Sequence, residues 1–287
     1  MLKRSFNIGL LITLFIIIPK GTLSRLMGYL ARIPFPKSLM NLIIQIFCNK
    51  YAINKHEILY PDKGFRTFDH FFTRRVKDGI HSINSTHNSI ISPTDSVISQ
   101  FGSINKTSII QAKGVEYSLD KLIPSEKYKE FIDGTFITLY LSPSDYHRIH
   151  SPVNGKITGY FHIPGKLYSV QEFMVNGFKG LFSKNERIIS YILTEKGMSA
   201  ICMIGAMNVG RITLNFSNII TNKTLRKKRE IFFSTDMQPM IKKGDELGKF
   251  HIGSTIILLF NKDAINFSET LKIGDKVRVG DAIAFFN

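Results

Sequence analysis

The sequence has few cysteines, no long uncharged apolar segment and none of the common nucleic-acid motifs. Only two cysteines, Cys48 and Cys202, occur in 287 residues, which excludes a fold held together by a disulfide framework. Both lie among apolar residues, so we expect buried, unreactive thiols. Zinc-finger spacing, basic-zipper heptads and an aromatic and basic RNA-binding motif are all missing, so nucleic acid is not an expected partner.

The apolar segment near the N-terminus is too short to cross a membrane. Ile8–Ile18 is an uncharged run of 11 residues, whereas a spanning helix needs about 20. No small-residue cleavage site follows closely, so a cleaved signal peptide is not expected. The next segments place apolar residues at helical spacing, with Arg25, Arg32, Lys37 and Lys50 among them. Basic amphipathic helices favour a chain that lies on a membrane surface; the alternative is that they cover the protein's own core.

Acidic residues are also scarce relative to basic ones. Lys and Arg total 38 against 22 Asp and Glu, which gives a formal net charge of +16. Such a balance favours an anionic partner, and a membrane with acidic lipids is one. The 44% apolar content and 23 Phe argue against disorder, and the length allows a large core in one domain or two.

The pattern of the sequence changes near residue 80. Residues 1–80 read as helical and end with an aromatic and basic helix at Phe65–Val76, whereas residues 81–287 contain short β-rich runs separated by Gly, Pro, Asn and Asp. This predicts an α+β fold, with a helical membrane-associating region followed by a mostly antiparallel β domain that carries the chemistry. Ile241–Phe250 and Leu271–Phe286 share a Gly-Asp pattern typical of tight turns, which favours a hybrid barrel like that of biotinyl and lipoyl carriers in the C-terminal half.

Two polar stretches stand out in the β-rich part. Asp95 lies in a Ser-Pro-Thr-Asp turn, and His147 and His150 lie three residues apart in a stretch bounded by Pro143 and Pro152. That spacing puts both imidazoles on one face of a helical turn, but on opposite faces of a strand. A metal site needs three or four ligands, and no further cluster supplies them, so no metal is expected.

A third stretch, GKFHIGSTIILLF, places Gly253 and Ser254 directly before an apolar run that predicts a buried strand. A nucleophilic serine needs a base and an orienting acid, and Asp95, His150 and Ser254 supply these residue types. One hypothesis is therefore a serine hydrolase acting on a lipid ester, although the Gly-x-Ser-x-Gly elbow of esterases is absent. A non-enzymatic alternative is a basic membrane-binding or nucleic-acid-binding module.

Five stretches together resemble one family over nearly the whole chain. QAKGVEYSLDKL, YLSPSDYHRIHSPVNG, LFSKNER, GAMNVGRI and GKFHIGSTIILLF are similar to segments of bacterial phosphatidylserine decarboxylase, a pyruvoyl-dependent proenzyme of the prokaryotic type I. The chain departs from the family pattern at Ser96, where Gly usually follows the aspartate, and at Arg211, in a stretch that is usually less polar.

The resemblance implies that Ser254 attacks the carbonyl of Gly253, with His150 as the base and Asp95 orienting it. The chain would be cut into a β chain (1–253) and an α chain (254–287), and Ser254 would become a pyruvoyl group, which is the implied cofactor. A Schiff base between this group and phosphatidylserine would accept the electrons as CO₂ leaves, with phosphatidylethanolamine as the product. The resemblance assigns His147 to decarboxylation and to the return of the proton, a role that suits imidazole.

The resemblance also implies the surroundings in which the protein works. The expected partners are phosphatidylserine, an anionic membrane surface and, for each cleavage fragment, the other fragment; a homo-oligomer is left open. The expected location is the cytoplasmic face of the inner membrane, to which the protein would bind peripherally.

Overall fold

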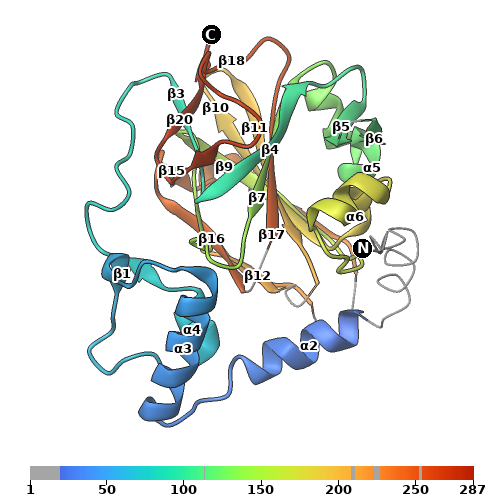
Figure 1. The fold of residues 1–287 in the computed structure, drawn as a ribbon. Helices are drawn as coiled ribbons and strands as arrows, with labels where there is room; N and C mark the ends of the chain where they lie inside the picture. The colour runs from blue at the N-terminus through green and yellow to red at the C-terminus, as the bar shows by residue number, and fades with distance from the viewer. Residues whose placement is uncertain (1–19, 113, 208–210, 223–226, 252–253) are drawn as a thin grey trace, which may run out of the picture.

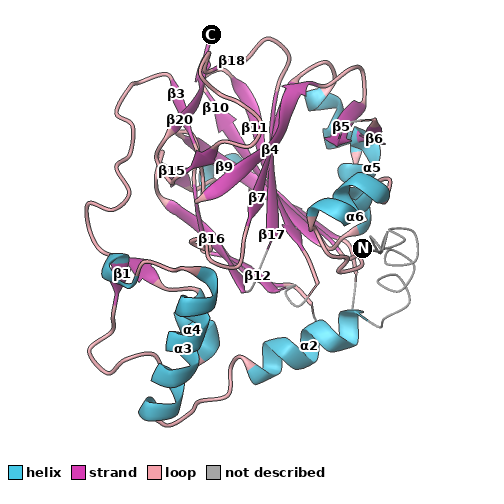
Figure 2. Cartoon of the chain, in the orientation of Figure 1, coloured by secondary structure: helices cyan, strands magenta, loops and turns pink. Residues whose placement is uncertain are grey.

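Helices form the first part of the molecule and antiparallel sheets form the rest, as the computed structural model in Figure 1 shows. The structure describes residues 20–112, 114–207, 211–222, 227–251 and 254–287. Ile8–Ile18, Ile252 and Gly253 lie outside the described residues. Figure 2 gives the same division by element type, and the predicted α+β class is confirmed.

The N-terminal helices carry apolar residues on more than one face. They are α2 (Lys20–Leu30) and α3 (Lys37–Tyr51). In α3, Met40, Ile44 and Cys48 form a buried stripe at the four-residue spacing of one helix face. Among the described helices, none is long and apolar enough to span a bilayer.

The helix predicted over Phe65–Val76 is shorter than expected. Only α4 (Phe68–Phe72) is helical, and Thr67 caps its N-terminus by accepting a hydrogen bond from the His70 amide at 3.1 Å. The following residues leave the helix because β2 (Arg75–Val76) pairs with β1 (Ile58–Leu59) in a small antiparallel sheet. A single-turn 3₁₀ helix, η1 (Lys55–Glu57), precedes β1.

The largest sheet has nine strands in the order β14-β9-β10-β11-β17-β7-β4-β19, and β15 also pairs with β9. Every pairing in this sheet is antiparallel. The strands are β4 (Ser96–Ser103), β7 (Thr135–Leu141), β9 (Gly155–Ile163), β10 (Arg187–Thr194), β11 (Gly197–Gly205), β14 (Arg229–Phe232), β15 (Met240–Ile241), β17 (Ser254–Phe260) and β19 (Lys276–Val277).

The central strand β17 is buried on both faces, which explains its continuous apolar sequence. All seven of its residues are buried. Ile256 and Leu258 belong to one apolar cluster, whereas Ile257 and Leu259 belong to a second cluster on the opposite face. The buried strand that the sequence predicts here is therefore confirmed. Cys202 in β11 and Cys48 in α3 are also buried and free, and burial raises the pKa of the Cys202 thiol to about 12.

The remaining strands form smaller antiparallel sheets, and no sheet among the described strands closes into a barrel. The hybrid barrel expected for the C-terminal half is therefore not present there, because its strands are divided among three separate sheets. The further elements are β8 (Arg148–His150), β12 (Arg211–Leu214), β13 (Ser217–Ile220) and β16 (Glu246–His251) in one sheet; β3 (Ser89–Ile91), β18 (Ile265–Phe267) and β20 (Ala282–Phe286) in another; the pair β5 (Ser108–Ala112) and β6 (Val115–Ser118); and the short helices α5 (Leu119–Leu122), η2 (Glu126–Phe131), α6 (Glu172–Gly177), α7 (Leu181–Lys184) and η3 (Thr235–Met237).

The predicted Gly-Asp turns are confirmed, and they share one geometry. In each turn the glycine has a φ between 90° and 98°, in the left-handed region that favours glycine. The aspartate carboxylate then accepts a hydrogen bond from the amide three residues earlier, at 2.7–2.8 Å. The turns are Lys242–Asp245, Lys272–Asp275 and Arg278–Asp281.

Candidate active site

Ser254 lies at the first position of β17, in the interior of the protein. Its backbone is opposite Gly205 of β11 and Leu141 of β7. The residue has no exposed surface, and its Oγ has no hydrogen-bond partner among the described residues. Because buried polar atoms are normally paired, an unpartnered hydroxyl at the start of a core strand is a candidate reacting group.

The LFSKNER stretch fixes the strand beside Ser254. The Asn185 amide donates to the Gly205 carbonyl at 2.9 Å, and the Gly205 amide donates to the Glu186 carbonyl at 2.8 Å. Arg187 is buried and donates to the backbone carbonyls of Lys121, Leu122, Ser183 and Asn185 at 2.7–2.8 Å. These bonds hold Gly205, and therefore its neighbour in the sheet, in a fixed register.

Of the two histidines in the Pro-bounded stretch, one lies on a strand and the other lies directly before it. His150 ends β8 and His147 immediately precedes that strand. Ser142 to Asp145 form a turn, in which the Asp145 carboxylate accepts from the Ser142 amide at 2.7 Å. Of the two readings that the spacing allowed, the structure therefore selects the extended one.

His147 is fully buried and presents one free nitrogen. Its Nδ1 donates to the Asp145 carbonyl at 2.8 Å, while its Nε2 has no partner among the described residues. The Phe72 ring lies 4.2 Å from the imidazole, centroid to centroid. Burial lowers the pKa of His147 to about 3, so the imidazole is neutral at physiological pH and its Nε2 can accept a proton.

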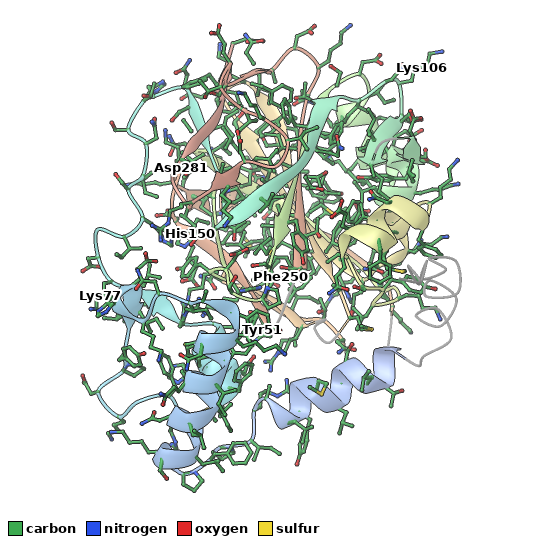
Figure 3. All side chains as sticks on the ribbon, in the orientation of Figure 1. Tyr51, Lys77, Lys106, His150, Phe250 and Asp281 are labelled. Carbon is green, nitrogen blue, oxygen red and sulfur yellow. The ribbon has the colours of Figure 1, made fainter. Side chains whose placement is uncertain are left out.

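His150 has partners at both ring nitrogens. Its Nδ1 donates to the Gly244 carbonyl at 2.6 Å, which leaves Nε2 to accept from the Tyr146 hydroxyl at 3.1 Å. Burial lowers its pKa as well, so this imidazole is also neutral. Figure 3 labels His150 and Phe250 in the lower half of the β-rich part in that view, on the side toward the helices.

Asp95 does not bond to His150, which corrects the expected orienting contact. Its carboxylate lies 2.9 Å from Nε2 of His81 and accepts from the Val279 amide at 2.9 Å. The Tyr146 ring contacts both His81 and His150: its centroid lies 4.8 Å from the centroid of the His81 ring and 5.7 Å from that of the His150 ring. Among the described residues, the Asp95 carboxylate is therefore linked to the His150 imidazole through the side chains of His81 and Tyr146.

Sequence reasoning missed His81 and Tyr146. Tyr146 is part of the His-containing stretch, so its aromatic hydroxyl beside the histidine pair was an available signal. His81 gives no such signal, because it lies in a Gly-containing loop and meets Asp95 only through the fold. In the part of the chain that the structure describes, no group of three or more His, Cys, Asp or Glu side chains is arranged to hold a metal.

A buried serine hydroxyl and neutral, buried imidazoles are the kinds of group found in enzyme active sites, so these residues indicate an enzyme. A family model described as phosphatidylserine decarboxylase matches residues 68–285, and a second model described as PSD matches residues 10–52. The chain belongs to the phosphatidylserine decarboxylase family.

Individual relatives agree with the family match along almost the full chain. The phosphatidylserine decarboxylase proenzyme of Saccharophagus degradans is 39% identical over 271 residues, covering 93% of this chain and 94% of that protein. The proenzymes of Myxococcus xanthus and Vibrio cholerae are 36% and 38% identical, each covering 93% of this chain and 95% of the relative.

Proposed function

We propose that this protein decarboxylates phosphatidylserine to phosphatidylethanolamine with a pyruvoyl group that it makes from its own Ser254. Family membership supports the reaction. The observation that carries the assignment to Ser254 is its buried Oγ at the start of β17, which has no hydrogen-bond partner among the described residues. Among the described residues, Ser190 and Ser254 are the serines with a buried, unpartnered Oγ, and of these two Ser254 directly follows a glycine.

The proposed self-cleavage balances without any added reagent except water. Ser254 Oγ attacks the Gly253 carbonyl carbon, the peptide C–N bond breaks, and the chain is joined by an ester. Loss of the Ser254 α-proton then breaks the ester C–O bond, which leaves a carboxylate on Gly253 and a dehydroalanine at residue 254. Water converts the dehydroalanine to the pyruvoyl group and releases ammonia.

We assign the base of this step to His150 and a supporting role to Asp95. His150 is neutral, and its Nε2 accepts a hydrogen bond from the Tyr146 hydroxyl. This hydrogen bond must break before Nε2 can accept the proton of Ser254. Asp95 is placed against His81, whose ring contacts Tyr146. Asp95 therefore acts by fixing His81 and Tyr146 rather than by direct contact with the base.

His147 is assigned to the decarboxylation itself. The pyruvoyl carbonyl supplies an electron sink for the electron pair released as CO₂ leaves. The free Nε2 of His147, kept unprotonated by burial, holds and returns the proton that the product carbon requires. The residues present fit this chemistry, because both His147 Nε2 and Ser254 Oγ are buried and have no hydrogen-bond partner in the part of the chain that the structure describes.

The two cleavage fragments are proposed to remain associated. Residues 254–287 contribute β17 between β11 and β7, β19 beside β4, and β20 beside β3. All of these partners belong to residues 1–253, so cutting the chain before residue 254 leaves the sheet pairings intact. We therefore propose two regions, a helical region (1–80) and a β-rich catalytic region (81–287). The proposed cut falls inside the β-rich region, so both fragments contribute strands to it.

The helices are proposed to bind the cytoplasmic face of the inner membrane peripherally. In α3, Leu42 and Ile46 are 53% and 59% exposed and lie on the face opposite the buried stripe. Leu26 and Leu30 of α2 are exposed as well. Apolar side chains of this kind can enter the lipid layer, and a chain of net charge +16 is attracted to anionic phosphatidylserine.

Replacing Ser254 tests the proposal, with Ser190→Ala as a matched control. Ser190 of β10 is also fully buried and has an unpartnered Oγ among the described residues. We expect Ser254→Ala to stay one 32.7 kDa chain without decarboxylation, and Ser190→Ala to be cleaved and active. Decarboxylation by Ser254→Ala would refute the proposal. If the wild-type chain stays uncut and hydrolyses lipid esters, the serine hydrolase is favoured. If it stays uncut and shows neither activity, the non-enzymatic binding module is favoured.

A further inference from the structure

One short segment of the helical region contacts the catalytic strands at several points. This α4 segment (Phe65–Val76) places Phe72 against the His147 ring. The Thr73 carbonyl accepts from Nε of Arg148 at 2.9 Å. Arg74 donates to the Ser144 carbonyl at 2.8 Å. The sequence suggested only a helix that ends the helical region, yet its side chains and backbone hold the His-containing stretch.

The same segment also holds the strand that leads to the cleavage site. Nδ1 of His251 lies 2.8 and 3.0 Å from the two carboxylate oxygens of Asp69, 182 positions away in the sequence. Nε2 of His251 lies 3.2 Å from Oγ1 of Thr213 in the neighbouring strand β12. His251 is the last residue of β16 and lies three positions before Ser254, so both of its ring nitrogens are fixed directly before the proposed cut.

We propose that Asp69 and His251 form a positioning pair for self-cleavage. The inference rests on the proposed function, because it concerns the rate at which the Gly253–Ser254 bond is cut. An intramolecular attack is fastest when the attacking hydroxyl and the chain that carries the carbonyl are both held in the geometry that the reaction needs. Ser254 is fixed by its pairing with Gly205 and Leu141, and the Asp69–His251 pair fixes the chain on the other side of the bond.

The pair also makes cleavage depend on docking of the helical region. The Asp69 amide donates to the Ala31 carbonyl at 2.8 Å, just after α2, while the Asp69 carboxylate bonds to His251 of β16. The carboxylate is in place only when the α4 segment lies against the β-rich part. A proenzyme whose helices have not docked would therefore be cut slowly.

The test measures the cleavage rate of full-length protein made by cell-free synthesis, by following the appearance of the 254–287 fragment after synthesis is stopped. Asp69→Ala removes a hydrogen bond to a charged group, and we expect cleavage to slow by about tenfold or more. Asp69→Asn keeps an acceptor oxygen for His251, so it should recover much of the rate. Because the two residues act as a unit, the double variant Asp69→Ala/His251→Ala should be no slower than the slower single variant.

Glu57→Ala is the matched control. The Glu57 carboxylate also joins the helical region to the β-rich part, through Arg278 at 2.6 Å, but it contacts no residue of the site described above. This variant should be cut at the wild-type rate. Asp69→Ala cleaved at the wild-type rate, Asp69→Asn as slow as Asp69→Ala, or equal slowing by Glu57→Ala would each overturn the inference. Failure of the proposed function is distinguishable, because then the wild-type chain itself would yield no fragment.

Discussion

The helical region and the β-rich region use their apolar residues in opposite ways. In β17 every side chain is buried, and the two faces of the strand feed two separate clusters. In α3 one stripe is buried, whereas Leu39, Leu42 and Ile46 on the opposite face are exposed. Apolar residues of the strands therefore stabilise the fold that holds Ser254, whereas those of the outer face of α3 remain exposed, as the proposed membrane binding requires.

The largest expected effect concerns the two histidines of the β-rich region. His150→Ala should slow self-cleavage by about 10²–10⁴-fold and leave uncut proenzyme, because it removes the proposed general base. His147→Ala should still be cut but should decarboxylate poorly. Asp95→Ala should resemble His150→Ala in accumulating uncut chain. Intact mass and CO₂ release measure the two steps separately, and equal cleavage of all three variants would contradict the assignment.

A leucine in each region gives the next comparison, and it concerns stability. Leu258→Ala in β17 removes a fully buried side chain and should lower the free energy of unfolding by about 2–5 kcal/mol. Leu42→Ala on the exposed face of α3 should change it by no more than about 0.5 kcal/mol. Both are measured by urea unfolding in the uncut Ser254→Ala background. Similar losses for the two leucines would show that the outer face of α3 is covered in solution.

For membrane binding we expect the opposite order: a change on the outer face of α3 should have a large effect, and a change on a strand should have little. Leu42→Glu/Ile46→Glu should weaken binding to phosphatidylserine vesicles by about tenfold or more, because burial of an apolar side chain contributes about 1.5–3 kcal/mol. Self-cleavage should be unaffected. Leu193→Glu is the control, since Leu193 is an exposed leucine of strand β10. Vesicle sedimentation measures the binding, and equal weakening by the control would count against helix insertion.

The last expected effect is a pH dependence of stability from His147. The folded state holds the pKa of His147 at about 3, below the value of about 6.5 in an unfolded chain. The unfolded chain therefore binds the proton more readily. The contribution of His147 to the free energy of unfolding is fully present above about pH 6.5 and is lost as the pH falls. The slope is on the order of 1 kcal/mol per pH unit between about pH 6 and pH 4. His147→Gln in the Ser254→Ala background should flatten it in urea titrations, and an unchanged slope would place the dependence elsewhere.

Local features of the fold could be predicted from the sequence, whereas contacts between distant segments could not. The buried strand β17 and the turn at Gly244 follow from an apolar run and from glycine's access to positive φ. The Asp95–His81 and Asp69–His251 pairs depend on how the sheets and α4 pack, and no local pattern records them. The barrel prediction was wrong because repeated turns do not determine which strands pair.

An intact mass spectrum of freshly purified wild-type protein tests the central claim most directly. The account predicts two non-covalently associated chains, residues 1–253 and 254–287, with a ketone in place of an amine at the start of the smaller one. A single 32.7 kDa chain with no ketone and full decarboxylase activity would contradict it.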